Sequence, residues 1–331
     1  MSDIVTLNVG EARKLAEDAC KAAGAGEATT RSLVEATLSA ELYGSQSVGF
    51  PHLVDYLVSF REGRLNKEPE VRIERPFPAF ITADADTGIA QLGFDLAFGD
   101  LVATARKFGL AAFSQANSYA SGELGYYVRR LAGEGLVAFA VTNANAFMVA
   151  TPGGRPVFST NPLAFAFPLG DGIAPLVIDQ SSSATAYVNL MAAAAEGRSI
   201  PRGWAVDAEG RETDDASRAL AGALLPFGGR KGANIALMVE MMAAGLSGGN
   251  WSMDAGDFIS GDRSPGIGLT VIAMMPGPQE ADRVSRARAH VARLKDLGVY
   301  VPGTTRQGPR EAVTMPKTVF EKIRAIIASA A

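Results

Sequence analysis

The feature that most constrains this fold is an alternation of strand-like and helix-like segments through the middle of the chain. Short apolar runs at 79–86, 110–117 and 136–144 are separated by helical patterns at 91–109 and 126–135. Helices that alternate with apolar strands pack on the faces of a sheet, so this pattern predicts an α/β layer fold.

The same kind of pattern continues toward the C-terminus. Two further strands are expected on either side of the turn Gly-Asp-Gly at 170–172, and an alanine-rich helix should end near Glu196. The remaining expected elements are a long apolar helix after 226–232, a strand at 268–276, and helices at 281–298 and 316–330.

The N-terminal region has a different pattern. From Val9 to Phe60 the apolar residues recur every three or four positions, which is typical of helices. A cluster of prolines, Pro69, Pro76 and Pro78, then breaks any helix. We therefore expect a helical domain at 1–75, joined by about 280–331, and a central α/β domain at 76–279.

Charge and composition exclude several classes of function. A net charge of -4 does not require the basic face that nucleic acid needs. A single cysteine permits no internal disulfide, and one cysteine with two histidines argues against a zinc site. The N-terminus has no apolar leader, and the most apolar run, 233–246, is interrupted by Asn234 and Glu240. We expect a soluble cytoplasmic protein with no metal, nucleic-acid or membrane partner.

The segment PFGGRKG at 226–232 is the first candidate site, because it opens a helix. Its glycines allow close approach of backbone N–H groups, and the helix N-terminus and Lys231 both favour an anion. It suits a phosphate or ribose. The alternative is a tight turn before a buried helix.

The segment VIDQSSSAT at 177–185 is the second candidate, because an apolar strand ends there in an acid and three hydroxyls. The serines can donate to phosphate oxygens, and Asp179 can accept from ribose hydroxyls or cap the following helix. The alternative is a helix cap with solvated serines. A third, weaker signal is the Asn and Thr content of 142–161, which also suits turns.

Several blocks carry a family resemblance through their order along the chain. They read SVGFPHLVDYL, GIAQLGFDLA, NSYASGELGYY, STNPLAFAFP, LVIDQSSSA, IPRGWAVDAEGRETDD, LLPFGGRKGANIALMVEMMAAGLSGG and VPG. In this order they resemble the malate/L-lactate dehydrogenase family, which is distinct from the Rossmann-type lactate dehydrogenases. The segments GGNWSMD and DQSSSA look most like the cyclic ketimine reductases that act on delta-1-piperideine-2-carboxylate and delta-1-pyrroline-2-carboxylate.

This resemblance implies an NAD(P)H-dependent oxidoreductase with a non-Rossmann, mixed-sheet cofactor domain, which would account for the absence of a GxGxxG motif. It also implies a homodimer. On the family pattern, Asn145 and Thr160 would lie near the substrate. The residues that would line NADPH or NADH are Asp179, Gln180, Ser181, Ser182, Ser183, Lys231, Gly232, Pro302 and Gly303, with Arg306 as a cation for a 2'-phosphate.

The chain departs from the family at the positions that move protons. The usual Ser-His-Gly triplet reads Ser47-Val48-Gly49, a second histidine position holds Ala120, and the aspartate of the ketimine reductases is replaced by Asn189. Reduction of a ketone leaves an alkoxide that needs a proton, and general acid assistance is worth about a hundredfold to ten-thousandfold. A cyclic imine can arrive already protonated, so these losses favour C=N reduction.

His52 stands where many members carry an arginine that pairs with the substrate carboxylate. It could bind that carboxylate or donate a proton, or it could be a packed helix residue. Tyr119 could supply a hydroxyl to the substrate, although aromatic packing is the alternative. We predict reduction of a cyclic or N-substituted imine next to a carboxylate, with Ser47, His52 and Asn189 as catalytic candidates. The alternatives are a 2-oxoacid/2-hydroxyacid dehydrogenase with a substitute acid, and a nucleotide-binding protein without catalysis.

Overall fold

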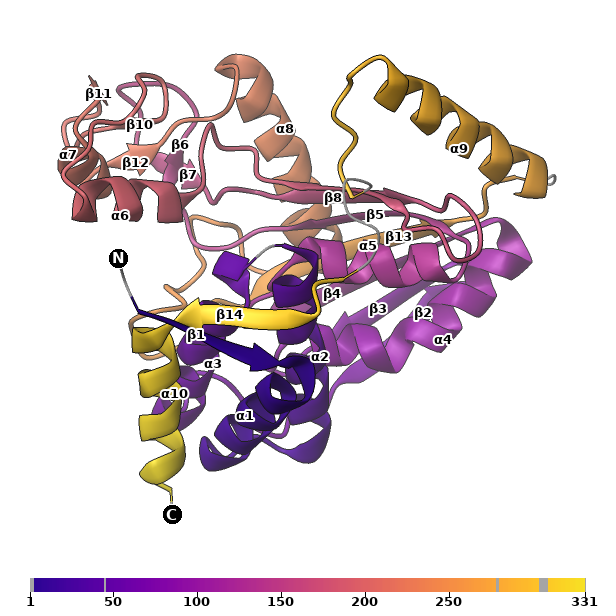
Figure 1. Ribbon diagram of the computed structural model, residues 1–331, viewed down its shortest axis with the longest axis horizontal. Coiled ribbons are helices and arrows are strands. Elements are labelled where there is room, and N and C mark those ends of the chain that lie inside the picture. The colour runs from indigo at the N-terminus through magenta and orange to yellow at the C-terminus, as the bar shows by residue number, and fades with distance from the viewer. Residues whose placement is uncertain (1–2, 45, 278–279, 304–308, 331) are drawn as a thin grey trace.

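A computed structural model describes residues 3–44, 46–277, 280–303 and 309–330. Its centre is a seven-stranded mixed sheet in the order β2-β3-β4-β13-β5-β8-β9 (Figure 1). The strands are β2 (Arg72–Phe77), β3 (Phe80–Asp84), β4 (Leu110–Ser118), β13 (Ile267–Met274), β5 (Val137–Thr142), β8 (Leu163–Phe167) and β9 (Leu176–Gln180). Only β3 and β4 are parallel; every other neighbouring pair is antiparallel. The predicted α/β class with a mixed sheet is therefore confirmed.

Helices cover both faces of this sheet. Successive side chains of a strand point to opposite faces, and in β5 Ala138 and Ala140 pack with α4 (Ala90–Phe108) and α5 (Leu124–Gly133). Phe139 and Val141, on the other face, pack against α8 (Arg230–Glu240) and the π-helical segment Met241–Gly245 that continues it.

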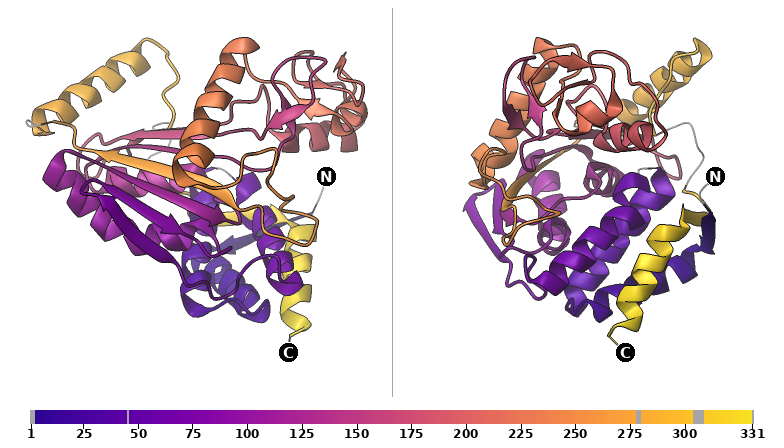
Figure 2. Two further views of the ribbon diagram at one scale, coloured as in Figure 1. Left: turned by 180° about the vertical axis from the view of Figure 1, so that it is seen from behind. Right: turned by 90° about the vertical axis from the view of Figure 1, so that its left-hand side faces the viewer.

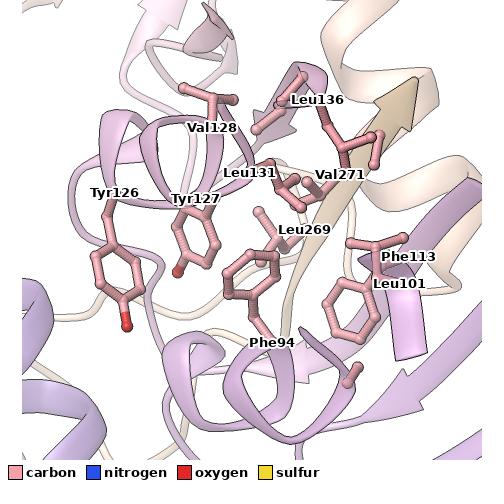
Figure 3. Close-up of a cluster of buried hydrophobic side chains, with 14 of the residues drawn as sticks. Phe94, Leu101, Phe113, Tyr126, Tyr127, Val128, Leu131, Leu136, Leu269 and Val271 are labelled. Atoms are coloured by element: carbon pink, nitrogen blue, oxygen red, sulfur yellow. The ribbon is translucent and has the colours of Figure 1, made fainter. Parts of the chain in front are cut away.

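The core under α4 and α5 is rich in aromatic side chains. Figure 3 shows Phe94, Phe113 and Tyr127 in this cluster, with leucines and valines of α5 and β13 around them. The ring centroids of Phe94 and Tyr127 lie 4.9 Å apart in an edge-to-face arrangement, which adds about 0.5–1.5 kcal/mol to the burial of the rings.

The two ends of the chain form one helical unit. Strand β1 (Ile4–Asn8) pairs antiparallel with β14 (Ala312–Pro316). The helices α1 (Val9–Ala22), α2 (Glu27–Tyr43), α3 (Phe50–Glu62) and α10 (Lys317–Ala328) pack around a shared apolar core. Figure 2 shows α10 beside the N-terminal helices.

The domain division predicted at 75/76 and near 280 stays a prediction, although two elements lie differently from that expectation. Strand β2 spans this boundary and belongs to the central sheet. Helix α9 (Glu280–Asp296) does not join the helical unit, because its Val291 is buried with Leu169 beside β8 and β9.

A third, smaller unit carries a five-stranded sheet in the order β11-β10-β12-β6-β7. Its strands are β6 (Met148–Val149), β7 (Pro156–Phe158), β10 (Ala205–Val206), β11 (Glu212–Thr213) and β12 (Ala223–Leu224). The helices α6 (Tyr187–Ala195) and α7 (Ala216–Leu220) pack with it (Figure 1). Within the described residues, no helix combines the length and apolar character needed to cross a bilayer.

Candidate functional site

The serine triplet and the glycine turn lie side by side. Phe227 N donates to Ser182 O at 3.0 Å, Ala184 N donates to Leu225 O at 2.7 Å, and Ser183 forms an isolated bridge with Pro226. Two segments that are more than forty positions apart in the sequence therefore form one continuous surface at the end of β9.

The turn at 226–232 has the conformation that its glycines permit. Gly228 and Gly229 have positive φ angles of 58° and 62°. A Cβ on Gly232 would lie 2.9 Å from Phe227 N and closer still to Phe227 O, so the turn folds back tightly on the start of α8. Lys231 is exposed in the first helical turn, where the helix dipole and its ammonium group both favour an anion.

The loop at Pro302 and Gly303 lies against the same strand. Val177 N is 3.4 Å from Pro302 O, and Gly303 has a φ angle of 76°. A Cβ at Gly303 would be 2.7 Å from Val177 N, so only glycine fits this approach to β9. The predicted cation Arg306 lies outside the described residues.

Asp179 is held at the start of α5. Its Oδ2 accepts a hydrogen bond of 2.7 Å from Gly125 N. Burial of the carboxyl group raises the pKa of Asp179 to about 6, and Glu123 acts in the same direction, whereas the bond from Gly125 opposes the shift. The residue as a whole is exposed along β9, like Gln180, so this burial concerns the carboxyl group beside α5. Asp179 therefore contacts α5 and not the helix that follows it in sequence.

All three serines already form hydrogen bonds within the protein, and Ser181 Oγ accepts from Ser183 Oγ at 3.0 Å. Ser182 Oγ donates to Asn161 O at 2.7 Å, and Ser183 Oγ lies 2.7 Å from Thr185 O. Both residues are buried, while Ser181 is half-buried. The solvated cap considered as an alternative therefore does not describe Ser182 and Ser183.

The predicted substrate residues border this surface. Thr160 O accepts from Ser182 N at 2.7 Å, which ties the two segments together. Asn145 is half-buried, and its Oδ1 is buried with no hydrogen-bond partner among the described residues. An unpaired buried carbonyl oxygen of this kind costs about 1–3 kcal/mol, so a ligand that donates a hydrogen bond to Asn145 Oδ1 would remove this cost. Asn189 is exposed and donates to Thr185 Oγ1 at 2.9 Å.

His52 lies in an aromatic cluster in the helical unit. Its ring meets Tyr56 and Phe258 edge to face, with centroids 4.9 and 5.4 Å apart, and Nδ1 is 3.2 Å from Asp55 Oδ2. This is the packed arrangement considered as an alternative, with 13% of the side chain exposed. A role with substrate stays a prediction.

Tyr119 belongs to the same cluster and is 1% exposed. Its hydroxyl is 2.6 Å from Ser59 Oγ and donates to Phe258 O. Burial raises the pKa of Tyr119 to about 12. These contacts are those of a packed aromatic side chain. The predicted contact of Tyr119 with substrate stays a prediction.

The segment that carries Ser47 is fixed by a neighbouring carboxylate. Ser47 is exposed in a short 3-10 helix, Gln46–Val48. Glu41 Oε1 accepts from Phe50 N at 2.8 Å, and a Cβ on Gly49 would lie 2.7 Å from Glu41 Cδ. A side chain at the third position of the triplet would therefore have to displace the Glu41 carboxylate that accepts from Phe50 N.

Two cavities lie outside the assigned cofactor and substrate segments, and the first of them is lined by Asp55, the residue in contact with His52. One of about 390 Å³ is lined by Val54 and Asp55 of α3 and Ile326 of α10, and one of about 380 Å³ lies in the smaller unit near Asp207 and Gly222. Neither is lined by a residue that the sequence analysis assigned to cofactor or substrate. In the described part of the chain, no three His, Cys, Asp or Glu side chains are grouped as metal ligands.

One buried polar group at the site was missed. Glu240 was noted only as a charge that interrupts an apolar helix. In the structure it is 5% exposed and accepts hydrogen bonds from Asn161 and Ser252. A single carboxylate within an apolar helix was the signal that could have identified it.

The chain is similar to known proteins over nearly its full length. The family model for malate/L-lactate dehydrogenase matches residues 7–322. The (2R)-3-sulfolactate dehydrogenase (NADP(+)) of Chromohalobacter salexigens is 37% identical over 99% of both chains. The Delta(1)-pyrroline-2-carboxylate/Delta(1)-piperideine-2-carboxylate reductase of Pseudomonas putida is 34% identical over 94% of this chain and 92% of that protein.

A solved structure agrees with this result. The crystal structure of delta1-piperideine-2-carboxylate reductase from Pseudomonas syringae pvar. tomato superposes with a TM-score of 0.88 at 30% identity, over 97% of this chain and 99% of that one. The match to the family model and these full-length similarities confirm the resemblance found in the sequence blocks. The chain belongs to the malate/L-lactate dehydrogenase family.

Proposed function

We propose that this protein is an NADPH-dependent or NADH-dependent reductase of a cyclic or N-substituted imine next to a carboxylate. The observation that carries the proposal is the contact between the serine triplet and the turn at 226–232, made through Phe227 N and Ser182 O. Full-length similarity to pyrroline- and piperideine-2-carboxylate reductases supports the choice of substrate class.

The residues at this surface fit a nicotinamide dinucleotide. Gly232 and Gly303 are places where any side chain would collide with backbone, and Lys231 supplies a positive charge at a helix N-terminus. We assign the phosphates to this turn and the substrate to the side of Asn145 and Thr160. A bound NADPH supplies a hydride to the carbon of the C=N bond.

For this reaction the protein needs no side chain that donates a proton during hydride transfer. A protonated imine that accepts a hydride becomes a neutral amine, so no group has to donate a proton as the C–H bond forms. Val48, Ala120 and Asn189 carry no titratable side chain, which suits an imine better than a ketone. In this proposal Asn145 Oδ1, which is buried without a hydrogen-bond partner among the described residues, accepts a hydrogen bond from the iminium N–H.

The alternative is a 2-hydroxyacid dehydrogenase, which the 37% identity to a sulfolactate dehydrogenase favours. The test is to follow consumption of NADPH and NADH with delta-1-piperideine-2-carboxylate and delta-1-pyrroline-2-carboxylate, and in parallel with 2-oxoacids that include 3-sulfopyruvate. We expect turnover with the imines to exceed turnover with the 2-oxoacids. Higher activity with a 2-oxoacid would support the dehydrogenase, and nucleotide binding without turnover would support a protein that has lost catalysis.

We also infer that the protein is a homodimer in the cytoplasm. Supporting this, large apolar side chains are about half exposed along α8 and the following loop, namely Leu237, Met241, Leu246, Trp251 and Met253. Several exposed apolar side chains on one segment are typical of an association surface between subunits. Light scattering should give twice the monomer mass, and Met241→Lys should shift the protein toward monomer. A monomeric wild-type protein would contradict the inference.

A further inference from the structure

Glu240 is a buried carboxylate at the end of α8, and all of its described partners are neutral. Its Oε2 accepts from Asn161 Nδ2 and from Ser252 Oγ, both at 2.7 Å, and its Oε1 accepts from Ser252 N at 2.6 Å. Burial of a carboxylate is costly unless it is fully hydrogen-bonded, and these three donors offset part of that cost.

Both residues that donate to Glu240, Ser252 and Asn161, are connected by further hydrogen bonds to the backbone on either side of Asn145. On one side, Ser252 O accepts from Ala146 N at 2.9 Å. On the other side, Ser159 Oγ donates to Asn161 Oδ1 at 2.7 Å. The same Ser159 Oγ accepts a hydrogen bond from Ala144 N at 3.1 Å. The backbone that presents Asn145 is thus held from both sides by contacts that meet at one carboxylate.

Asn161 also connects Glu240 with the serine triplet. Asn161 O accepts from Ser182 Oγ at 2.7 Å, and Asn161 has a φ angle of 38°, which is uncommon for a residue other than glycine. Its Nδ2 donates to Ala236 O as well, at 2.7 Å. Since Lys231 and Gly232 lie at the other end of α8, one helix carries both the cofactor turn and this carboxylate.

We propose that Glu240 is a positioning residue that fixes the substrate turn at 144–146 relative to the cofactor helix α8. The inference rests on the proposed function for the identity of the two ligands. Glutamine cannot replace it, because three donors converge on the two carboxylate oxygens. In either orientation, the amide nitrogen of glutamine would face Ser252 N or Asn161 Nδ2, which are both donors.

The first test needs no turnover. Hydrogen exchange of the Ala144 and Ala146 amides, measured by NMR on the whole protein, should be about tenfold faster in Glu240→Gln than in the wild-type protein. The matched control is Thr270→Val. This change removes the bonds of Thr270 Oγ1 to Met242 O at 2.7 Å, in the segment that continues α8, and to Ser114 Oγ at 2.8 Å, without touching Asn161 or Ser252. Equal exchange of these two amides in the wild-type protein and in folded Glu240→Gln would overturn the proposal.

The second test separates positioning from stability. With an imine substrate, Glu240→Gln should lower kcat/KM about tenfold or more and leave the Kd for NADPH within about threefold of the wild-type value, whereas Thr270→Val should change neither. Unchanged kcat/KM in an active, folded Glu240→Gln would contradict the positioning role. If the wild-type protein reduces no imine, the proposed function fails, while the exchange measurement still decides the role of Glu240.

Discussion

Replacing Gly232 with alanine tests whether the turn at 226–232 packs as tightly as the structure indicates. The new Cβ would lie 2.9 Å from Phe227 N and closer to Phe227 O, and backbone atoms cannot rotate away as a side chain could. Overpacking of this kind costs about 1–3 kcal/mol. Alanine offsets about 0.5–1 kcal/mol of this cost through its helix propensity, so the expected net loss in the free energy of unfolding is about 0–2.5 kcal/mol, with a central value of about 1 kcal/mol.

The matched control is Gly99→Ala in the exposed middle of α4, where a Cβ meets no atom within 4 Å. The same substitution should there stabilise the protein by about 0.5–1 kcal/mol. Urea unfolding followed by circular dichroism measures both. Gly232→Ala should also raise the Kd for NADPH at least about tenfold, because Phe227 N is bonded to Ser182 O. Equal effects of the two substitutions would refute the packing argument.

Three further predictions concern individual side chains. Lys231→Ala should cost about 1.5–3 kcal/mol of nucleotide binding, measured by NADPH fluorescence titration. The control is Lys322, an exposed lysine on α10 outside the assigned cofactor segments, where Lys322→Ala should leave the Kd unchanged. Because the pKa of Asp179 is raised to about 6, its folded form binds a proton more tightly than the unfolded chain does. The contribution of Asp179 to stability is therefore present at low pH and is lost as pH rises from about 4 to about 6. Asp179→Asn should flatten this part of a plot of the urea unfolding midpoint against pH. A plot that is unchanged in Asp179→Asn would contradict the raised pKa. If His52 contacts substrate, His52→Ala should lower kcat/KM and leave the Kd for NADPH unchanged. Activity retained by His52→Arg would show that His52 binds the substrate carboxylate. Loss of activity in His52→Arg with substrate still bound would show that His52 transfers a proton.

The central strands and helices could be predicted because their apolar periodicity is strong and local. The helix expected at 91–109 is α4, Ala90–Phe108, and the strand expected at 110–117 is β4, Leu110–Ser118. Strands β10, β11 and β12 have two residues each, which is too short for any period to show. Their pairing depends on contacts between segments that are distant in the sequence.

Strand β2 was missed for another reason. Its Pro76 was interpreted as a break between domains, but all six of its residues are exposed at the edge of the sheet. An edge strand tolerates proline because one of its sides needs no hydrogen-bond donor. Strands β1 and β14 were missed because they pair across nearly the full length of the chain.

The candidate site was predictable as a set of segments and not as a network. The order of motifs grouped the serine triplet with the turn at 226–232, and the structure brings them into contact. The hydrogen bond between Asn161 and Glu240 joins residues 79 positions apart. The periodicity of apolar residues along the sequence cannot predict a contact between two such distant residues. Tyr119 was identified by residue type and His52 by residue type and its place in the family pattern, and neither signal distinguishes a packed aromatic side chain from a functional one.

The central claim is hydride transfer to the carbon of a C=N bond, and isotope transfer tests it most directly. The protein would be incubated with delta-1-piperideine-2-carboxylate and NADPH that carries deuterium in the transferred position of the nicotinamide ring, using each of the two C4 stereoisomers in turn. Our account predicts that one stereoisomer gives a cyclic amino acid with a single deuterium at the carbon that bears the carboxylate, detected by mass spectrometry and NMR. A product without deuterium from both stereoisomers, or transfer to 2-oxoacids but not to the imine, would contradict it.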